Sequence, residues 1–187
     1  MSTRDLVLSA LFAAIIVALG ILPPITLGFI PVPITAQSLG VMMAGVVLGA
    51  RRATIAVLIV LVLVAIGLPV LSGGRGGLAA FAAPTTGFLV GWVFAALTTG
   101  FLSERLAKPE QSAALQLVGF FLAATIGGII VLYAFGIAYL AVAAQIGLKQ
   151  AFVGSLAFIP GDVIKAFVAA LVGRAVMAGY PLLPARN

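Results

Sequence analysis

The chain has 187 residues, of which 64% are hydrophobic and only 7% are charged, and its mean hydropathy is +1.33. A soluble domain cannot bury that much apolar surface, so the composition excludes a soluble fold and favours one integral membrane domain over residues 1–187. The net charge of +6 comes from basic residues scattered between apolar stretches, which indicates topological anchors and not a nucleic-acid partner.

The first predicted span covers residues 6–22. Ala10, Ala14 and Ala18 recur every four residues on one face of this span, and such a stripe of small residues allows another helix to approach closely. The stripe faces either a neighbouring helix of the same bundle or a separate protein.

Residues 23–35 contain four prolines, which exclude a regular helix, yet the segment is too apolar for a solvated loop. Irregular backbone at a membrane is tolerated where it is buried in protein or lines a cavity, so we expect a lid or a wall here. The second span is predicted over residues 36–50, with Gln37 near its start, and the third over residues 53–68. Arg51 and Arg52 mark the turn between them.

A loop with four glycines around Arg75 follows the third span, over residues 72–77. Glycine lets the backbone approach a ligand and expose its N–H groups. The alternative is a flexible external turn. The spacing of the glycines is not that of a phosphate-binding P-loop.

The fourth and fifth spans are predicted over residues 84–102 and 115–143, separated by the polar connection 103–112. Tyr133 and Tyr139 lie in the fifth span, where tyrosines more often anchor a helix at the interface than bind a ligand. A short link that holds Gln145 and Lys149 leads to the sixth span, residues 161–178.

Asp162 and Lys165 open the sixth span, just after Pro160 and Gly161. A spacing of three places the two charges on one helix face, one turn apart. Each charge in the middle of a membrane helix costs about 2.5–3.5 kcal/mol, so the pair needs compensation or a purpose. Either the two groups neutralise each other and hold helices in register, or they bind a ligand.

Six spans place both termini on one side of the membrane. If that side is cytoplasmic, it receives most of the basic residues: Arg4, Arg51, Arg52, Arg105, Lys108, Arg174 and Arg186. The other side receives Arg75 and Lys149. The positive-inside rule therefore predicts cytoplasmic termini in the plasma membrane, with the proline segment, the glycine loop and Asp162 at the outer face.

The outer face is then predicted to gather Gln37, Arg75, Asp162 and Lys165 within apolar walls. The walls are expected from Phe29, Ile30, Phe81 and Phe88. A mostly apolar pocket with a few convergent polar groups is typical of a small-molecule site. The carboxylate suits N–H donors, the ammonium a carbonyl and the guanidinium an acid, so a cyclic urea or amide with a distant carboxylate would satisfy all three.

Four segments carry a family resemblance, namely residues 28–37, 67–77, 83–88 and 160–165. Together they resemble the BioY family, the biotin-binding S-components of energy-coupling factor (ECF) transporters, over nearly the whole chain. One segment departs from the family pattern, since Thr86 and Phe88 stand where a glycine and a tyrosine are expected. The resemblance therefore supplies no tyrosine hydroxyl at that place.

The resemblance implies an all-α membrane protein of six helices, with outer loops forming a lid, that captures biotin for uptake. It implies a transmembrane coupling subunit and cytoplasmic ATPases as partners, and docking through Ala10, Ala14 and Ala18. Asp162 and Lys165 would bind the ureido ring, while Arg75 and Gln37 would place the acid or orient the ring. The remaining predicted binding residues are Phe29, Phe81 and Thr85. Biotin would be the transported ligand, and no cofactor is expected.

Two other functions remain in competition. A membrane-embedded enzyme could use Asp162 as a general base, although a chain without cysteine or histidine offers little other catalytic apparatus. A homo-oligomeric channel would show itself by conducting ions in bilayers.

Overall fold

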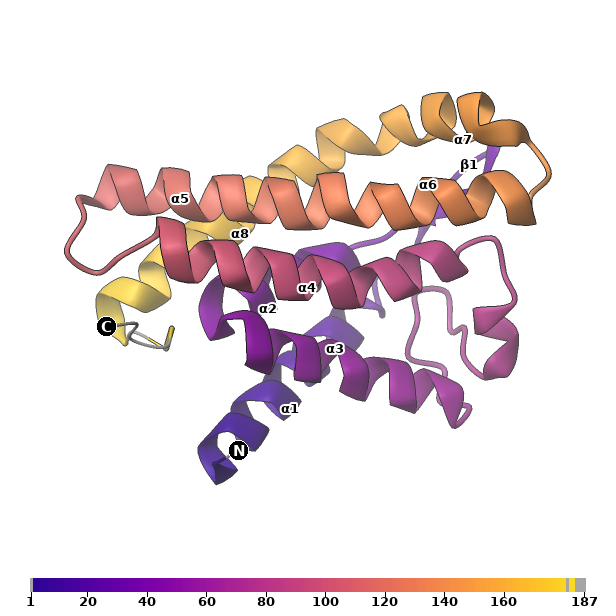
Figure 1. Ribbon diagram of the computed structural model, residues 1–187. Coiled ribbons are helices and arrows are strands. Elements are labelled where there is room, and N and C mark those ends of the chain that lie inside the picture. Colours follow the sequence, from indigo (N-terminus) through magenta and orange to yellow (C-terminus); the bar gives the residue numbers. More distant parts are fainter. Residues whose placement is uncertain (1, 181, 184–187) are drawn as a thin grey trace.

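The computed structural model describes residues 2–180 and 182–183, and within them the chain forms six helical rods with a cap at one end (Figure 1). The first four rods are single helices: α1 (Thr3–Leu19), α2 (Gln37–Leu48), α3 (Ala50–Ala65) and α4 (Thr86–Leu106). The fifth rod joins α5 (Ala113–Thr125), the π-helical turn η2 (Ile126–Val131) and α6 (Leu132–Ala143). The sixth joins α7 (Gly147–Ser155), the 3₁₀ turn η3 (Leu156–Phe158) and α8 (Ile159–Gly179).

Three of these rods are long and apolar enough to cross a bilayer: α4, the rod over residues 113–143 and the rod over residues 147–179. Helix α2 is apolar but has only 12 residues, and α1 and α3 have 17 and 16. A helix needs about 20 residues to span the hydrocarbon core, so each of these three is shorter than a full span. The predicted class, a six-helix membrane bundle with capping loops, is confirmed.

Several predicted boundaries need correction. The Arg51-Arg52 pair lies inside the first turn of α3, and the turn before it is made by Gly49 with φ 79°. The sixth rod begins at Gly147, so the supposed link around Lys149 is the helix α7. Pro160 does not break this rod, because it occupies the first turn of α8, where a missing N–H leaves no hydrogen bond unmade.

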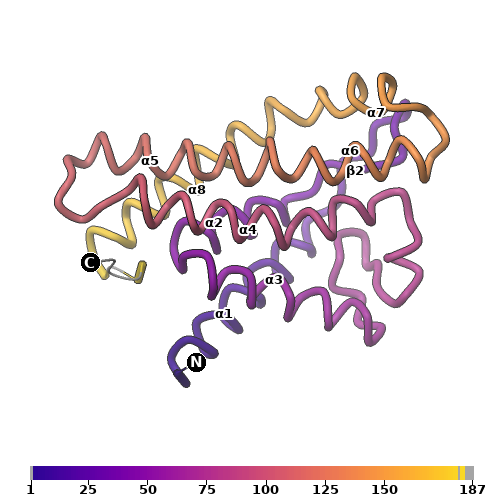
Figure 2. Tube along the Cα trace, in the orientation of Figure 1, coloured from indigo at the N-terminus to yellow at the C-terminus, as the bar shows by residue number. Residues whose placement is uncertain are grey.

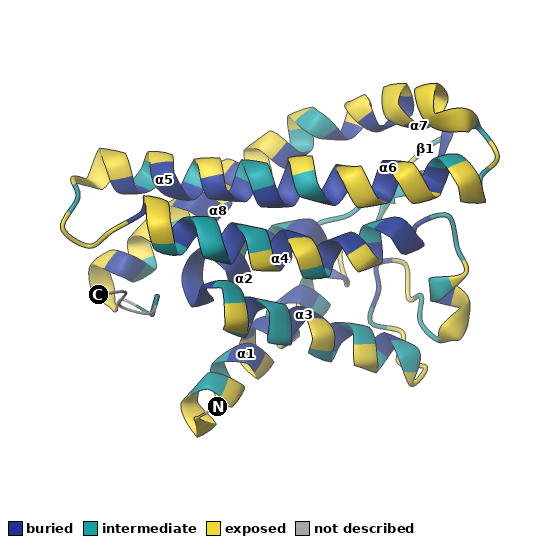
Figure 3. Ribbon diagram, viewed as in Figure 1, coloured by how far each residue is buried: buried dark blue, intermediate teal, exposed yellow. Residues whose placement is uncertain are grey.

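Close packing in the middle of the bundle depends on glycine. A Cβ on Gly100 of α4 would collide with the backbone of Gly49 and Ala50, and one on Gly45 of α2 would lie 2.6 Å from the Thr99 side chain. Gly127 in η2 packs against the same threonine. The buried faces of the rods therefore meet at backbone distance, while their outer faces are exposed (Figure 3).

The start of α1 and the end of α8 lie at the same end of the bundle (Figure 2). Asp5 forms a capping box with Ser2 and an ion pair of 2.6 Å with Arg52, which also donates to the Leu182 carbonyl at 2.8 Å. Hydrogen bonding from Ser2, and then the Arg52 guanidinium, lowers the pKa of Asp5 to about 2. These contacts tie the first helix, the third helix and the chain after α8 together.

The opposite end of the bundle carries the cap. Strands β1 (Ile25–Leu27) and β2 (Ile30–Ile34) form an antiparallel hairpin, so the proline segment is more regular than expected. Two-stranded pairing leaves each strand with a free edge, which tolerates proline. Gly154 of α7 packs against Ile30 of this hairpin. The 3₁₀ turn η1 (Leu78–Phe81) lies at the same end of the bundle, in the connection from α3 to α4.

Candidate functional site

A cavity opens between the cap and the helix ends. Its apolar walls come from β2, the turn after α3, α4, α6 and η3, namely Val32, Ile34, Leu71, Phe88, Leu89, Trp92, Leu132 and Phe158. Its polar lining consists of Thr35, Gln37, Ser38, Arg75, Thr85, Tyr133, Asp162 and Lys165. The centre of a water molecule can reach about 70 Å³ of this space. That volume holds several water molecules, so the space is a true cavity and not a packing defect.

The centre of the polar lining is the Asp162 carboxylate, which is only 5% exposed. Lys165 donates to its Oδ1 at 2.8 Å, and the Tyr133 hydroxyl donates to its Oδ2 at 2.6 Å. A carboxylate has about four lone-pair directions. Asp162 is therefore charge-compensated but retains acceptor capacity toward the cavity.

The Lys165 ammonium has all three of its donors engaged within the protein. Besides Asp162 it donates to the Thr35 carbonyl at 2.8 Å and to the Ser38 hydroxyl at 3.0 Å. Thr35 follows β2 and Ser38 lies in the first turn of α2, so this one side chain joins α8 to the base of the hairpin. A ligand carbonyl can reach Lys165 only by sharing or replacing one of these bonds.

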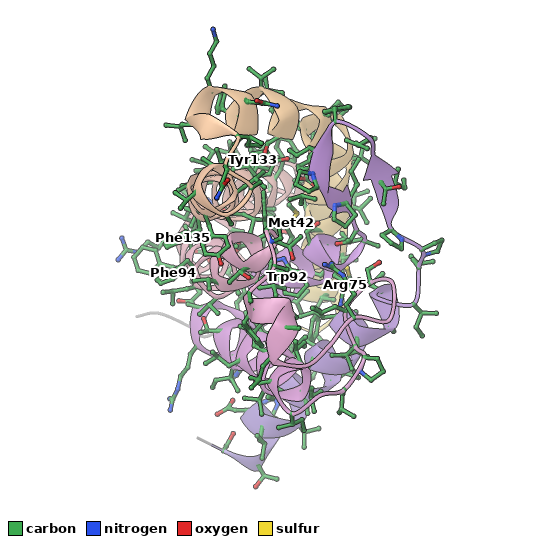
Figure 4. The ribbon with its side chains drawn as sticks, turned by 90° about the vertical axis from the view of Figure 1, so that its right-hand side faces the viewer. Met42, Arg75, Trp92, Phe94, Tyr133 and Phe135 are labelled. Atoms are coloured by element: carbon green, nitrogen blue, oxygen red, sulfur yellow. The ribbon has the colours of Figure 1, made fainter. Side chains whose placement is uncertain are left out.

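Arg75 enters the cavity from the turn after α3, whereas Tyr133 enters from α6 (Figure 4). The Arg75 guanidinium donates from Nε to the Ser72 carbonyl at 3.2 Å and from Nη1 to the Thr85 hydroxyl at 3.4 Å. Thr85 is buried, just before α4. Four predicted binding residues besides Asp162 thus line one cavity, namely Lys165, Arg75, Thr85 and Gln37.

The BioY family profile matches residues 1–182 of the chain. The chain belongs to the BioY family. It is 80% identical over 186 residues to a biotin transporter BioY of Rhizobium etli, with all of both chains covered, and 50% identical to a biotin transporter BioY of Rhodobacter capsulatus, with 95% of each covered. The fold matches a crystal structure of the S-component for biotin from an ECF-type ABC transporter, with a TM-score of 0.88, 37% identity and 95% of each chain covered.

Two aromatic residues predicted for the binding site of this BioY chain lie outside the cavity lining. Phe29 stands at the tip of the hairpin and is 63% exposed. Phe81 is half-buried at the end of η1. Phe88, where the resemblance leads us to expect a tyrosine, does line the cavity, together with Phe158 and Trp92. Sequence position near a family motif was therefore a poor guide to which aromatic side chains turn inward.

Three polar groups of the lining are not predicted from the sequence, namely Tyr133, Thr35 and Ser38, and Tyr133 was instead interpreted as an interfacial anchor. In this BioY chain it is 8% exposed and lines the cavity with its hydroxyl on Asp162. Its ring packs edge-on against Phe88 and Phe158, at centroid distances of 6.3 and 6.4 Å. A tyrosine hydroxyl is thus present in the cavity, supplied by α6 and not by the start of α4.

Proposed function

We propose that this chain is a biotin-capturing S-component, a binding and transport subunit and not an enzyme. The observation that carries the proposal is the hydrogen-bonded trio of the buried Asp162 and Tyr133 with the partly buried Lys165, in the wall of an otherwise mostly apolar cavity that Arg75 also lines. Biotin has a ureido ring with two N–H donors and a carbonyl, and a carboxylate at the end of an apolar chain. The remaining lone pairs of Asp162 suit the N–H groups, and the Arg75 guanidinium suits the acid.

The distribution of charge supports an orientation with both termini in the cytoplasm. The end of the bundle that holds the start of α1 and the end of α8 carries Arg4, Arg51, Arg52, Arg105, Lys108 and Arg174. Arg186 lies outside the described residues. The cavity end carries Arg75 and Lys149 besides the partly buried Lys165. The positive-inside rule then places the cavity at the outer face of the plasma membrane, where it receives biotin from outside.

Docking to a coupling subunit is proposed for α1. Ala10, Ala14 and Ala18 are all exposed, so the stripe does not serve packing within the chain. Val7 and Leu11 beside the stripe are 60% and 53% exposed. The stripe therefore remains open to a helix of a transmembrane partner, which would bring the cytoplasmic ATPases and the energy for uptake.

The proposal is tested by measuring biotin binding to the purified protein in detergent or nanodiscs. We expect saturable one-to-one binding and co-purification of biotin from membranes. A straight-chain fatty acid with the same carboxylate but no ureido ring should bind far more weakly. Absence of saturable biotin binding by folded protein would contradict the proposal.

Replacing Tyr133 by Phe is expected to lower biotin affinity about tenfold, because the Asp162 carboxylate loses the donor that orients its Oδ2, a charged hydrogen bond of about 1.5 kcal/mol. Isothermal titration of the purified variant checks this. Tyr139→Phe is the matched control, since Tyr139 lies on the same helix, outside the cavity lining and 36% exposed. Equal affinities of the two variants would remove Tyr133 from the site.

A further inference from the structure

We propose that Gln37 is a positioning residue that fixes Arg75 without binding the ligand itself. With Ser72 it fastens the turn that carries Arg75 to the end of α1. This inference rests on the proposed function, and it concerns the part of the site that would bind the carboxylate of biotin.

The amide of Gln37 is already occupied by backbone groups. Its Nε2 donates to the Ile16 carbonyl at 3.2 Å and to the Val70 carbonyl at 3.1 Å, and its Oε1 accepts from the Ser72 N–H at 2.8 Å. The side chain is 1% exposed. Both amide donors are thus spent on the protein, and a ligand could use only the remaining lone pair of the oxygen.

The turn that Gln37 holds is short and closed. Leu71 and Arg75 exchange two backbone hydrogen bonds, of 3.0 and 3.2 Å, around a tip where Gly73 and Gly74 have φ of 78° and 69°. These left-handed conformations suit glycine and fix the course of the turn. Any displacement at Val70 or Ser72 is therefore passed to Arg75.

Ser72 adds a second attachment to the first helix. Its hydroxyl donates at 2.9 Å to the carbonyl of Leu22, three residues beyond the end of α1. A Cβ on Gly20 would lie 2.7 Å from the Val70 carbonyl and 2.9 Å from the Gln37 amide nitrogen. The end of α1, Gln37 and the turn therefore fit together without spare space.

The position of the Arg75 guanidinium follows from this arrangement. Its Nε donates to the carbonyl of Ser72, and the N–H of the same Ser72 donates to Oε1 of Gln37. Loss of the Gln37 amide frees the turn and so weakens the interaction of Arg75 with the ligand acid. The ureido end, which is held by α6 and α8, is left unchanged.

The test compares biotin with its methyl ester, which keeps the ureido ring but carries no negative charge. Gln37→Met keeps the shape of the side chain and removes its hydrogen bonds. We expect about tenfold weaker binding of biotin, as for a lost guanidinium–carboxylate interaction, and a less than about twofold change for the ester. In an Arg75→Met background, Gln37→Met should have no further effect on biotin affinity.

Gln116→Met is the matched control. Gln116 is also buried, and it holds a loop at the opposite end of the bundle by donating to the carbonyls of Lys108, Pro109 and Gln111. The Gln116→Met variant should lower thermal stability as Gln37→Met does. It should leave the ratio of the affinities for biotin and for the ester unchanged. If Gln37→Met does not fold, Ser72→Ala serves as the test variant. We then expect a smaller loss of affinity that again affects biotin and not its methyl ester.

Two results would overturn the inference: an equal loss for biotin and the ester, or additive effects of Gln37→Met and Arg75→Met. Either would mean that Gln37 acts on the ligand or on the whole fold and not through Arg75. If the wild-type chain binds neither ligand, the proposed function fails instead. The two failures are therefore distinguishable.

Discussion

Replacing Asp162 by Asn is expected to weaken biotin binding by roughly 100-fold or more, because the ureido N–H groups lose an anionic acceptor, and losing a buried charged partner across an interface costs about 2–5 kcal/mol. The amide has the shape of the carboxylate, but its NH2 group replaces one of the two oxygens that accept from Lys165 and Tyr133, and its remaining oxygen carries no charge. It accepts the ureido N–H groups poorly for the same reason. Titration of biotin into purified Asp162→Asn protein measures the loss.

The control for this variant is Glu104→Gln. The Glu104 carboxylate accepts from the Ala50 N–H at 2.9 Å, at the other end of the bundle. The Glu104→Gln variant loses the negative charge on this acceptor, as Asp162→Asn does at the site. Glu104 is, however, not part of the cavity lining and lies far from it. We expect biotin affinity within about twofold of wild type, as for substitutions away from a site. Wild-type affinity in Asp162→Asn would remove the carboxylate from the binding site.

The sequence predicted much of the fold because hydrophobic spans are set by bilayer thickness and by charged flanks. The six rods, the position of the start of α1 and the end of α8 at one end of the bundle, and the Asp162–Lys165 contact all follow from spacing. The joint between α7 and α8 was missed, because Pro160 and Gly161 read as a break while the first turn of a helix accepts both. The π-helical turn at Ile126–Val131 has no comparable sequence signal.

The candidate site was predicted in its charges but not in its contacts. Composition and spacing identified the ionisable groups, because placing each of them in a membrane costs free energy. Which aromatic rings turn inward depends on tertiary packing, so Phe29 was misplaced and Tyr133 was overlooked. Tyr133 and Tyr139 are six residues apart, which places them about 120° apart around a helix, so the two side chains point in different directions. That spacing was the available signal.

The competing interpretation of the charge pair, helix registration alone, is decided by removing both charges together. Lys165→Met leaves the Asp162 carboxylate without its counter-ion and the Thr35 carbonyl and Ser38 hydroxyl without a donor. We expect its thermal midpoint to fall by roughly 10 °C, from a cost of about 3–5 kcal/mol. The double variant Asp162→Asn/Lys165→Met buries no charge and should recover most of that loss.

Binding should not recover with stability. The double variant lacks the anionic acceptor for the ureido N–H groups and the cation for its carbonyl, so its biotin affinity should stay roughly 100-fold or more below wild type. Differential scanning fluorimetry and biotin titration on the same preparations separate the two effects. Near wild-type binding by the double variant would make the pair a structural element only. The double variant could instead be no more stable than Lys165→Met. That result would show that the two charges do not compensate each other. The hydrogen bonds from Lys165 to Thr35 and Ser38 would then be what holds the base of the hairpin.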